Sequence, residues 1–211
     1  MKVIGSAMRA SLGMLLLIFL STPGLHANCL GGTSPIVIDL DGQGFRFTGL
    51  DDPVSFDIDA DGLMEQIGWI EAGSGAAFLV LDRNGNGRID TGRELFGSAT
   101  PQPLSEEPHG FRALAVFDDP EDGGNGDGYL SSIDGVWESL QLWFDHDHDG
   151  ITDPGELIPV PATQLYAVDL EYRTSRRRDR HDNLLRYTSM LMLHDDQIRP
   201  GVVDVVFVLG D

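Results

Sequence analysis

Short apolar runs alternate with acidic, glycine-rich runs along most of this chain. The apolar runs Ile36–Leu40, Ala76–Leu81 and Leu140–Phe144 each lead into a segment rich in aspartate. Short continuous apolar runs bounded by turn residues are typical of buried strands. The pattern therefore predicts that strands, rather than helices, enter the acidic segments.

Two segments show the spacing of an amphipathic helix. Pro108–Phe117 begins with a proline, which the first turn of a helix accepts, and places Phe111 and Leu114 on one face. Ser132–Leu140 carries apolar residues at i, i+3, i+4 and i+7, starting at Ile133. We expect both segments to be helical.

The C-terminal part of the chain lacks acidic clusters of this kind. After Pro161 the sequence predicts three strands, Leu165–Arg173, Leu184–Leu193 and Val202–Leu209, separated by polar turns. We interpret them as an antiparallel meander. The expected fold is therefore α+β, with short strands and helices around acidic loops and a C-terminal meander, in one domain over residues 35–211.

The most complete acidic segment reads DHDHDGITDPGE, from Asp145 to Glu156. Its acids and its glycine have the spacing of a twelve-residue EF-hand calcium loop. Position eight departs from that pattern, because Thr152 stands where an aliphatic residue is usual. The candidate Ca²⁺ ligands are Asp145, Asp147, Asp149, the carbonyl of Ile151, Asp153 and Glu156. The alternative is a solvated acidic turn without a metal.

Two further segments repeat this spacing less completely. The first has Gly68 at position twelve, and its candidate ligands are Asp57, Asp59, Asp61 and Glu65. The second has its closing acid one position late, so that Glu94 is either a ligand or a helix-start acid. The candidate ligands of the second segment are Asp82, Asn84, Asn86, the carbonyl of Arg88, Asp90 and Glu94.

Two weaker segments complete the set. One has no acid at position nine or twelve, and its candidate ligands are Asp39, Asp41 and Gln43. The other requires an insertion after its first acid, and its candidate ligands are Asp118, Asn125, Asp127 and Asp134. A polar turn and an acidic, glycine-rich surface loop are the respective alternatives.

The formal net charge of the 211-residue chain is −20, which makes nucleic acid an unsuitable partner. Residues 1–27 have the pattern of a secretory signal peptide, with Lys2 and Arg9 before the apolar run Leu12–Leu20. That run is too short to span a bilayer. We therefore predict a secreted or periplasmic protein that does not span the membrane, with a linker at residues 28–34.

Cys29 is the only cysteine, so an intrachain disulfide is impossible. It is either the site of a lipid anchor or an inert thiol. Bound cations are then the obvious means of stabilising an exported domain of this charge. We accordingly expect the fold to form around several Ca²⁺ ions.

One turn in the C-terminal part is strongly basic. Its arginines are Arg173, Arg176, Arg177, Arg178 and Arg180. In an acidic protein this turn is a candidate surface for a protein or envelope partner. A loop leaning back on the acidic body and a solvated hairpin tip are the alternatives.

Several segments occur together in an order typical of one known family. They read SPIVIDLDGQGF, FDIDADGLMEQIGWI, FLVLDRNGNGRIDTGRELFG and FRALAVFD. In these segments the chain resembles the calcium-dependent self-processing module of the iron-regulated RTX proteins, over about residues 35–165. The resemblance implies that the acidic segments are calcium loops.

The resemblance also implies a reaction, in which calcium triggers cleavage of an Asp-Pro bond at the front edge of the module. The aspartate carboxyl attacks its own main-chain carbonyl, and the resulting anhydride releases proline. Here the matching dipeptide is Ser34–Pro35, and serine has no carboxyl group to form the anhydride. We therefore predict a calcium-binding module that is not an enzyme. The alternative is autoprocessing at Asp52–Pro53, Asp119–Pro120 or Asp153–Pro154.

Overall fold

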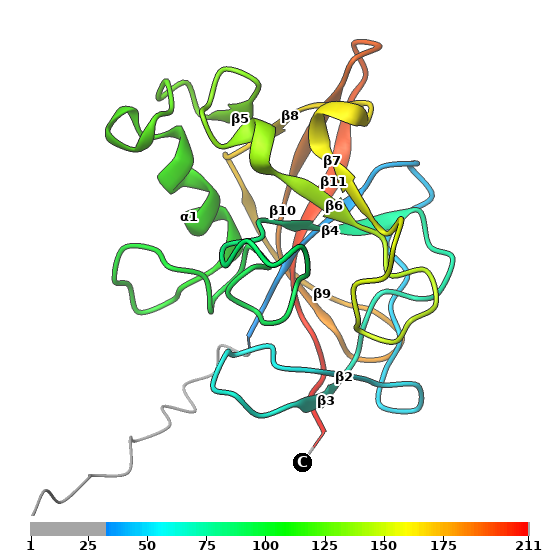
Figure 1. Cartoon of the computed structure of the whole chain (residues 1–211). Coiled ribbons are helices and arrows are strands. Elements are labelled where there is room, and N and C mark those ends of the chain that lie inside the picture. The colour runs from blue at the N-terminus through cyan, green and yellow to red at the C-terminus, as the bar shows by residue number, and fades with distance from the viewer. Residues whose placement is uncertain (1–32, 211) are drawn as a thin grey trace, which may run out of the picture.

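A computed structural model of the chain describes residues 33–210 (Figure 1). The predicted signal peptide and residues 28–32 of the predicted linker, including Cys29, lie outside the described residues. No helix within residues 33–210 is long and apolar enough to cross a membrane.

The described part of the chain is built on one nine-stranded antiparallel sheet. Its order is β5-β8-β10-β11-β1-β4-β6-β7, with β9 also paired to β10. The strands are β1 (Ile36–Asp39), β4 (Ala76–Val80), β5 (Tyr129–Ser131), β6 (Gln141–Trp143), β7 (Leu157–Pro159), β8 (Leu165–Asp169), β9 (Arg173–Arg178), β10 (Leu184–Leu193) and β11 (Ile198–Val206). A second, two-stranded sheet pairs β2 (Val54–Phe56) with β3 (Glu65–Ile67).

The helical elements are short. The α-helix α1 (Gly110–Ala115) lies to one side of the sheet in Figure 1 and runs directly into the 3₁₀ turn η1 (Val116–Asp118). The side chain of His109 caps α1 by accepting a hydrogen bond from the amide of Arg112. The other 3₁₀ turns are η2 (Pro120–Asp122), η3 (Trp137–Ser139) and η4 (Val160–Ala162).

Both faces of the central strands are buried, which explains why their sequences are continuously apolar. Successive side chains of a strand point to opposite faces. In β1, Ile36 and Ile38 therefore enter the core that also contains the apolar residues of α1. Val37 between them enters the second core, which we call the aromatic core because it contains Trp69 and Trp143. The acidic loops that begin at Asp57, Asp82 and Asp145 border this aromatic core, through Ile58, Ile89 and the two tryptophans respectively.

The predicted α+β fold class is wrong, because the described chain is mostly β. The helix predicted at Pro108–Phe117 is present as α1, but the helix predicted at Ser132–Leu140 is reduced to η3. The carboxylate of Asp134 accepts hydrogen bonds from the amides of Ser131 and Asn125 and holds this segment in a loop. Local hydrogen bonds to an aspartate carboxylate compete with helix formation.

The predicted C-terminal strands are present but do not form a separate meander. β10 pairs with both β8 and β11, and β9 is a further strand along β10. β1, the first strand of the chain, pairs with β11 and joins these strands to the N-terminal half of the sheet. Strands also flank the best acidic loop, with β6 before Asp145 and β7 after Glu156. This acidic loop therefore does not lie in a helix–loop–helix arrangement.

Candidate functional site

The acidic loop Asp145–Glu156 is anchored in the aromatic core at both ends. Asp145 and Glu156 are 3% and 4% exposed, so their carboxylates are held at the base of the loop. The indole Nε1 of Trp69 donates to Oδ2 of Asp145 at 2.7 Å. The indole of Trp143 donates to Oε2 of Glu156 at 3.1 Å. The first and last candidate ligands are therefore fixed by tertiary contacts.

The backbone of this loop wraps around the carboxylate of Asp145. Its two oxygens accept hydrogen bonds from the amides of His148, Asp149 and Gly150 at 2.7, 3.2 and 2.9 Å. Gly150 has a φ of 72°, which glycine adopts without the strain that a β-carbon would add. The loop is thus closed around the Asp145 carboxylate by its own backbone amides.

The carboxylates of this loop gather in two overlapping groups. Oxygens of Asp145, Asp147 and Glu156 lie within 4.8 Å of one another, and so do those of Asp147, Asp149 and Asp153. Desolvation, followed by the negative charges of Asp149 and Glu156, raises the pKa of Asp147. Carboxylate oxygens at this density are the ligands that hard divalent cations prefer, so the donor set fits such an ion. Ile151, the expected backbone ligand, has an exposed side chain.

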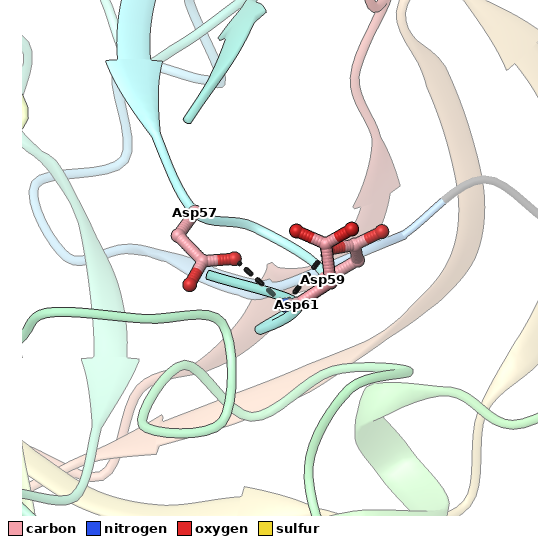
Figure 2. Close-up of side chains that lie close together, drawn as sticks. All are labelled: Asp57, Asp59 and Asp61. Carbon is pink, nitrogen blue, oxygen red and sulfur yellow. Dashed lines mark hydrogen bonds between the residues drawn. The ribbon is translucent and has the colours of Figure 1, made fainter. Parts of the chain in front are cut away.

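The loop that follows β2 holds a third group of carboxylates. Oxygens of Asp57, Asp59 and Asp61 lie within 4.8 Å of one another. The amide of Asp61 donates to both Asp57 and Asp59, at 3.0 and 3.1 Å (Figure 2). Glu65 accepts a hydrogen bond from Ile58 in the same loop. Burial, opposed by that hydrogen bond and reinforced by the charge of Asp59, raises the pKa of Glu65. Three of the four predicted ligands are thus brought together, and Glu65 bonds to the same loop outside that group.

The loop from Asp82 to Glu94 is closed mainly by hydrogen bonds. Asp82 accepts from the amide of Gly87, and Asp90 accepts from the side-chain amides of Asn84 and Asn86. Glu94 is 3% exposed and accepts from the amide of Asp90 at 2.8 Å, so it turns back onto the loop. Within residues 33–210, no three carboxylates of this loop come within 4.8 Å. Arg88 is exposed in the loop.

The eighth positions of two loops meet, which explains the unusual Thr152. The amide of Ile89 donates to Oγ1 of Thr152 at 3.0 Å. Ile89 is the eighth residue of the Asp82 loop, and Thr152 is the eighth residue of the Asp145 loop. The threonine hydroxyl therefore links the two loops, a contact that neither loop reveals in its own sequence.

The first weak segment already has a counter-charge. Asp39 accepts from the amides of Gly42 and Gly44, and Nη1 of Arg199 lies 3.6 Å from its Oδ2. Asp41 accepts a hydrogen bond from the amide of Gln43. Among the described residues, Asp39 and Asp41 belong to no group of three ligand atoms within 4.8 Å of one another. An arginine beside Asp39 reduces the need for a cation there.

The segment with the insertion folds into one loop. Asp118 accepts from the amides of Asp127 and Gly128 across the insertion. Asp134 is 2% exposed and accepts from Asn125. Burial raises the pKa of Asp134, and the negative charges of Asp118 and Asp127 raise it further. The hydrogen bonds that Asp134 accepts from backbone amides oppose this shift. The four predicted ligands lie in one loop, although they form no group within 4.8 Å among the described residues.

The front-edge dipeptide Ser34–Pro35 lies in a buried polar network that the sequence did not indicate. The hydroxyl of Ser34, a residue 2% exposed, donates to Oδ2 of Asp204 at 3.0 Å and accepts from Nη2 of Arg186 at 2.9 Å. Asp204 is fully buried and paired with Arg186 at 3.0 Å. Burial raises the pKa of Asp204, and the charge of Arg186 opposes that shift. The only sequence signal was an acid inside the apolar run Val202–Leu209.

The Asp52–Pro53 bond has a different neighbour. His148, from the acidic loop Asp145–Glu156, places Nε2 at 3.1 Å from the main-chain oxygen of Asp52. The same nitrogen is 3.8 Å from Oδ2 of Asp52. The sequence could not indicate this contact, because 96 positions separate the two residues.

The predicted arginine turn is instead largely a strand, β9, which lies at an exposed edge of the sheet because it pairs along β10. β9 pairs only with β10, and five of its six residues are exposed. Arg178 lies 3.5 Å from Asp182, and Arg180 lies 3.5 Å from Glu71. Two of the five arginines thus pair with acids of the body. Within residues 33–210, Arg173, Arg176 and Arg177 form no ion pair.

Comparison with known proteins identifies the family of this chain. Over 158 residues, or 72% of its length, the chain is 34% identical to the iron-regulated protein FrpA of Neisseria meningitidis serogroup C. The match spans 13% of that protein's length. The SPM domain matches residues 36–208. These findings bear out the resemblance to the self-processing module of iron-regulated RTX proteins, and the chain belongs to the SPM domain family.

Proposed function

We propose that this chain is an exported, calcium-dependent self-processing module. The observation that carries the proposal is the closed loop Asp145–Glu156, in which the carboxylates converge and both ends are held by indoles of the core. Because these anchors belong to the core, filling the loop and folding the domain are coupled. Membership of the SPM domain family supports self-processing, which was only the alternative reading of the sequence.

Calcium, when bound, supplies the positive charge that lets these carboxylates remain close together. The ligands in the main loop are Asp145, Asp147, Asp149, the carbonyl of Ile151, Asp153 and Glu156. The second site is formed by Asp57, Asp59, Asp61 and Glu65. We expect the main loop to bind most tightly, because it has the most carboxylates and a closing glutamate.

A calcium-folded binding module without cleavage is the second candidate function. Ser34 at the front edge favours it, because the hydroxyl is engaged with Asp204 and Arg186 and no carboxyl nucleophile is present there. Both candidates share the metal, and they differ in whether an internal Asp-Pro bond is cut.

Isothermal titration of the purified protein with Ca²⁺ and with Mg²⁺ tests the metal. We expect calcium to bind with heat and to raise the melting temperature, in the affinity range of about 10⁻⁴–10⁻³ M that is typical of extracellular modules. An absence of calcium heat together with unchanged melting in chelator would contradict both candidate functions. Intact mass after calcium addition separates them, because only self-processing produces fragments that begin with proline.

We further propose that the arginine segment around β9 binds an acidic partner when calcium is present. β9 leaves one side unpaired and carries Arg173, Arg176 and Arg177 at an exposed edge. Charge complementarity favours an acidic protein segment there. Capture from an envelope fraction with and without calcium tests it, with a triple Arg→Gln variant as control. Equal capture by both proteins would contradict this surface.

A further inference from the structure

Three acidic loops of this domain border one groove on its surface. The groove has a volume of about 410 Å³ and is lined by residues of β2 and of the loops that begin at Asp57, Asp82 and Asp145. We propose that this three-loop groove binds a cationic protein segment through an apolar side chain of that segment. The inference goes beyond the proposed function, because it requires the folded loops but no cleavage.

The three-loop groove has both buried and exposed apolar lining residues. Phe56 and Ile89 are each 2% exposed and belong to the aromatic core. Met64 and Ile151 are 66% and 54% exposed, and they line the same groove although they belong to different loops. Single exposed apolar residues are common on protein surfaces. Two that share a groove with buried apolar residues indicate a contact surface.

Contacts between the loops fix the walls of the groove. The amide of Ile89 donates to Oγ1 of Thr152 at 3.0 Å, which joins two of the loops. The amide of Gly92 donates to the main-chain oxygen of Asp57 at 2.8 Å, which joins the third. Gly150 packs so closely on β2 that a β-carbon has no room there. The groove is therefore already formed in the folded domain, and a preformed site avoids the entropy cost of ordering loops on binding.

The charge around the groove decides which partners fit it. The loops 57–65, 82–94 and 145–156 contain twelve acidic residues and three arginines. Arg88 lines the groove, and so do acids of two loops. One Ca²⁺ in each loop would still leave the acids in excess, so the surroundings are negative with or without metal. Lysine or arginine beside an apolar side chain is therefore attracted to the groove.

The same charge opposes other occupants. A nucleic acid, an anionic lipid surface and the acidic loops of a second copy are repelled. The arginine strand β9 of a second copy has the right charge, but its sequence RTSRRR offers no apolar side chain. The occupant that fits both the charge and the apolar lining is a cationic segment of another protein.

The size and lining of the groove suit one large side chain as an anchor. Its volume lies within the range of about 300–1,000 Å³ that is typical of small binding sites. The flexible side chain of Met64 adapts to apolar groups of different shape. One or two anchoring side chains usually provide most of the binding energy of such a contact. We therefore expect affinity to depend on the apolar anchor and on Met64.

Fluorescence anisotropy of the purified protein in millimolar Ca²⁺ tests the proposal. The probe is a labelled peptide in which one tryptophan and one leucine are flanked by lysines. One control peptide has serine in place of both apolar residues, and the other has glutamate in place of the lysines. We expect the probe to bind at least about tenfold more tightly than either control peptide.

Substitutions at Met64 locate the binding to the groove. Met64→Gln should lower the affinity for the probe about tenfold, because it removes an apolar contact, and should leave the melting temperature unchanged at so exposed a position. Met64→Leu keeps the contact apolar and should bind like wild type. Ile198→Gln is the matched control, because Ile198 is 60% exposed but lies on β11, outside the groove lining. It should also bind like wild type.

The outcomes separate this inference from the proposed function. Equal binding of the probe and the serine peptide would mean attraction by charge alone and overturns the inference. Tighter binding of the glutamate peptide overturns the assigned charge of the partner. An unchanged affinity of Met64→Gln, or an equal loss in Ile198→Gln, overturns the groove as the site. Failure of the probe to bind overturns the inference as well, whereas calcium titration without peptide still decides the proposed metal binding.

Discussion

Two X-Pro junctions of this domain lie in opposite environments. At Ser34–Pro35 the side chain before proline is buried and bonded to Asp204 and Arg186. At Asp52–Pro53 the side chain is exposed, and a buried histidine contacts the main-chain carbonyl instead. The first junction has a fixed polar side chain without a carboxyl group, and the second has an exposed carboxylate 3.8 Å from Nε2 of His148.

This difference shows that two junctions before proline in one domain can have opposite burial and different polar partners. The front edge matches the family by the order of segments, but serine stands before its proline, whereas aspartate stands before Pro53. In physical terms, the side chain of the first junction belongs to a buried polar network, whereas that of the second faces solvent. Substitutions at the two junctions and near them test this difference in burial and bonding.

The largest expected effect is on stability at the front edge. Asp204→Ala leaves the guanidinium of Arg186, 12% exposed, without its partner. An unpaired buried charge typically costs about 3–5 kcal/mol of unfolding free energy. Urea denaturation in calcium measures the loss. The double variant Asp204→Leu with Arg186→Met should lose less, and a loss below about 1 kcal/mol for Asp204→Ala would contradict a structural role.

The second effect is a pH dependence from His109, which lies beside Arg186. Burial, with the charges of Arg186 and Arg112, lowers the pKa of His109 to about 4 from 6.5. Between these values the unfolded chain binds more protons than the folded one, so stability falls as the pH falls through this window. The slope approaches about 1.4 kcal/mol per pH unit.

The measurement is the difference in unfolding free energy between wild type and His109→Gln from pH 7 to pH 5. The difference cancels the titration of the many carboxylates. We expect wild type to lose more stability than the variant as the pH falls. Parallel curves would show that His109 is not kept neutral by its surroundings.

The third effect concerns the loop that holds His148. Glu156→Gln keeps the size of the side chain but removes its charge, so calcium affinity should fall at least tenfold, which is about 1.4 kcal/mol. In chelator, relief of repulsion opposes the loss of one backbone hydrogen bond, and stability should change little. Titration and melting curves in both conditions measure this. Equal destabilisation with and without calcium would make Glu156 a purely structural residue.

The smallest effect is the stability of Asp52→Ala. The side chain is 72% exposed, and substitutions at such surface positions usually change stability by less than about 0.5 kcal/mol. Denaturation of this variant beside Asp204→Ala therefore compares the two junctions directly. A loss close to that of Asp204→Ala would mean that Asp52 is a structural residue like Ser34.

Local patterns in the sequence determined the parts of this protein that depend on neighbouring residues. The continuous apolar runs correctly indicated β1, β4 and β6, because a strand buried on both faces has no polar side. The spacing around Asp145 indicated a loop in which carboxylates converge, because glycine and alternate acids shape such a turn locally. Metal binding itself stays a prediction.

The tertiary structure decided everything that depends on distant partners. The α+β expectation failed because Asp134 bonds back to Ser131 and Asn125, which outweighs a helical apolar pattern. The pairing of β1 with β11 joins the two ends of the domain, and no periodicity reports it.

The contacts that distinguish the two junctions also depend on residues far apart in the sequence. Asp204 reaches Ser34 over 170 positions, and His148 reaches Asp52 over 96. Side-chain periodicity specifies which face of a strand is apolar, but it carries no information on which strands and loops become neighbours. The sequence alone therefore determined the acidic loops, and only the folded sheet determined which peptide bond lies beside them.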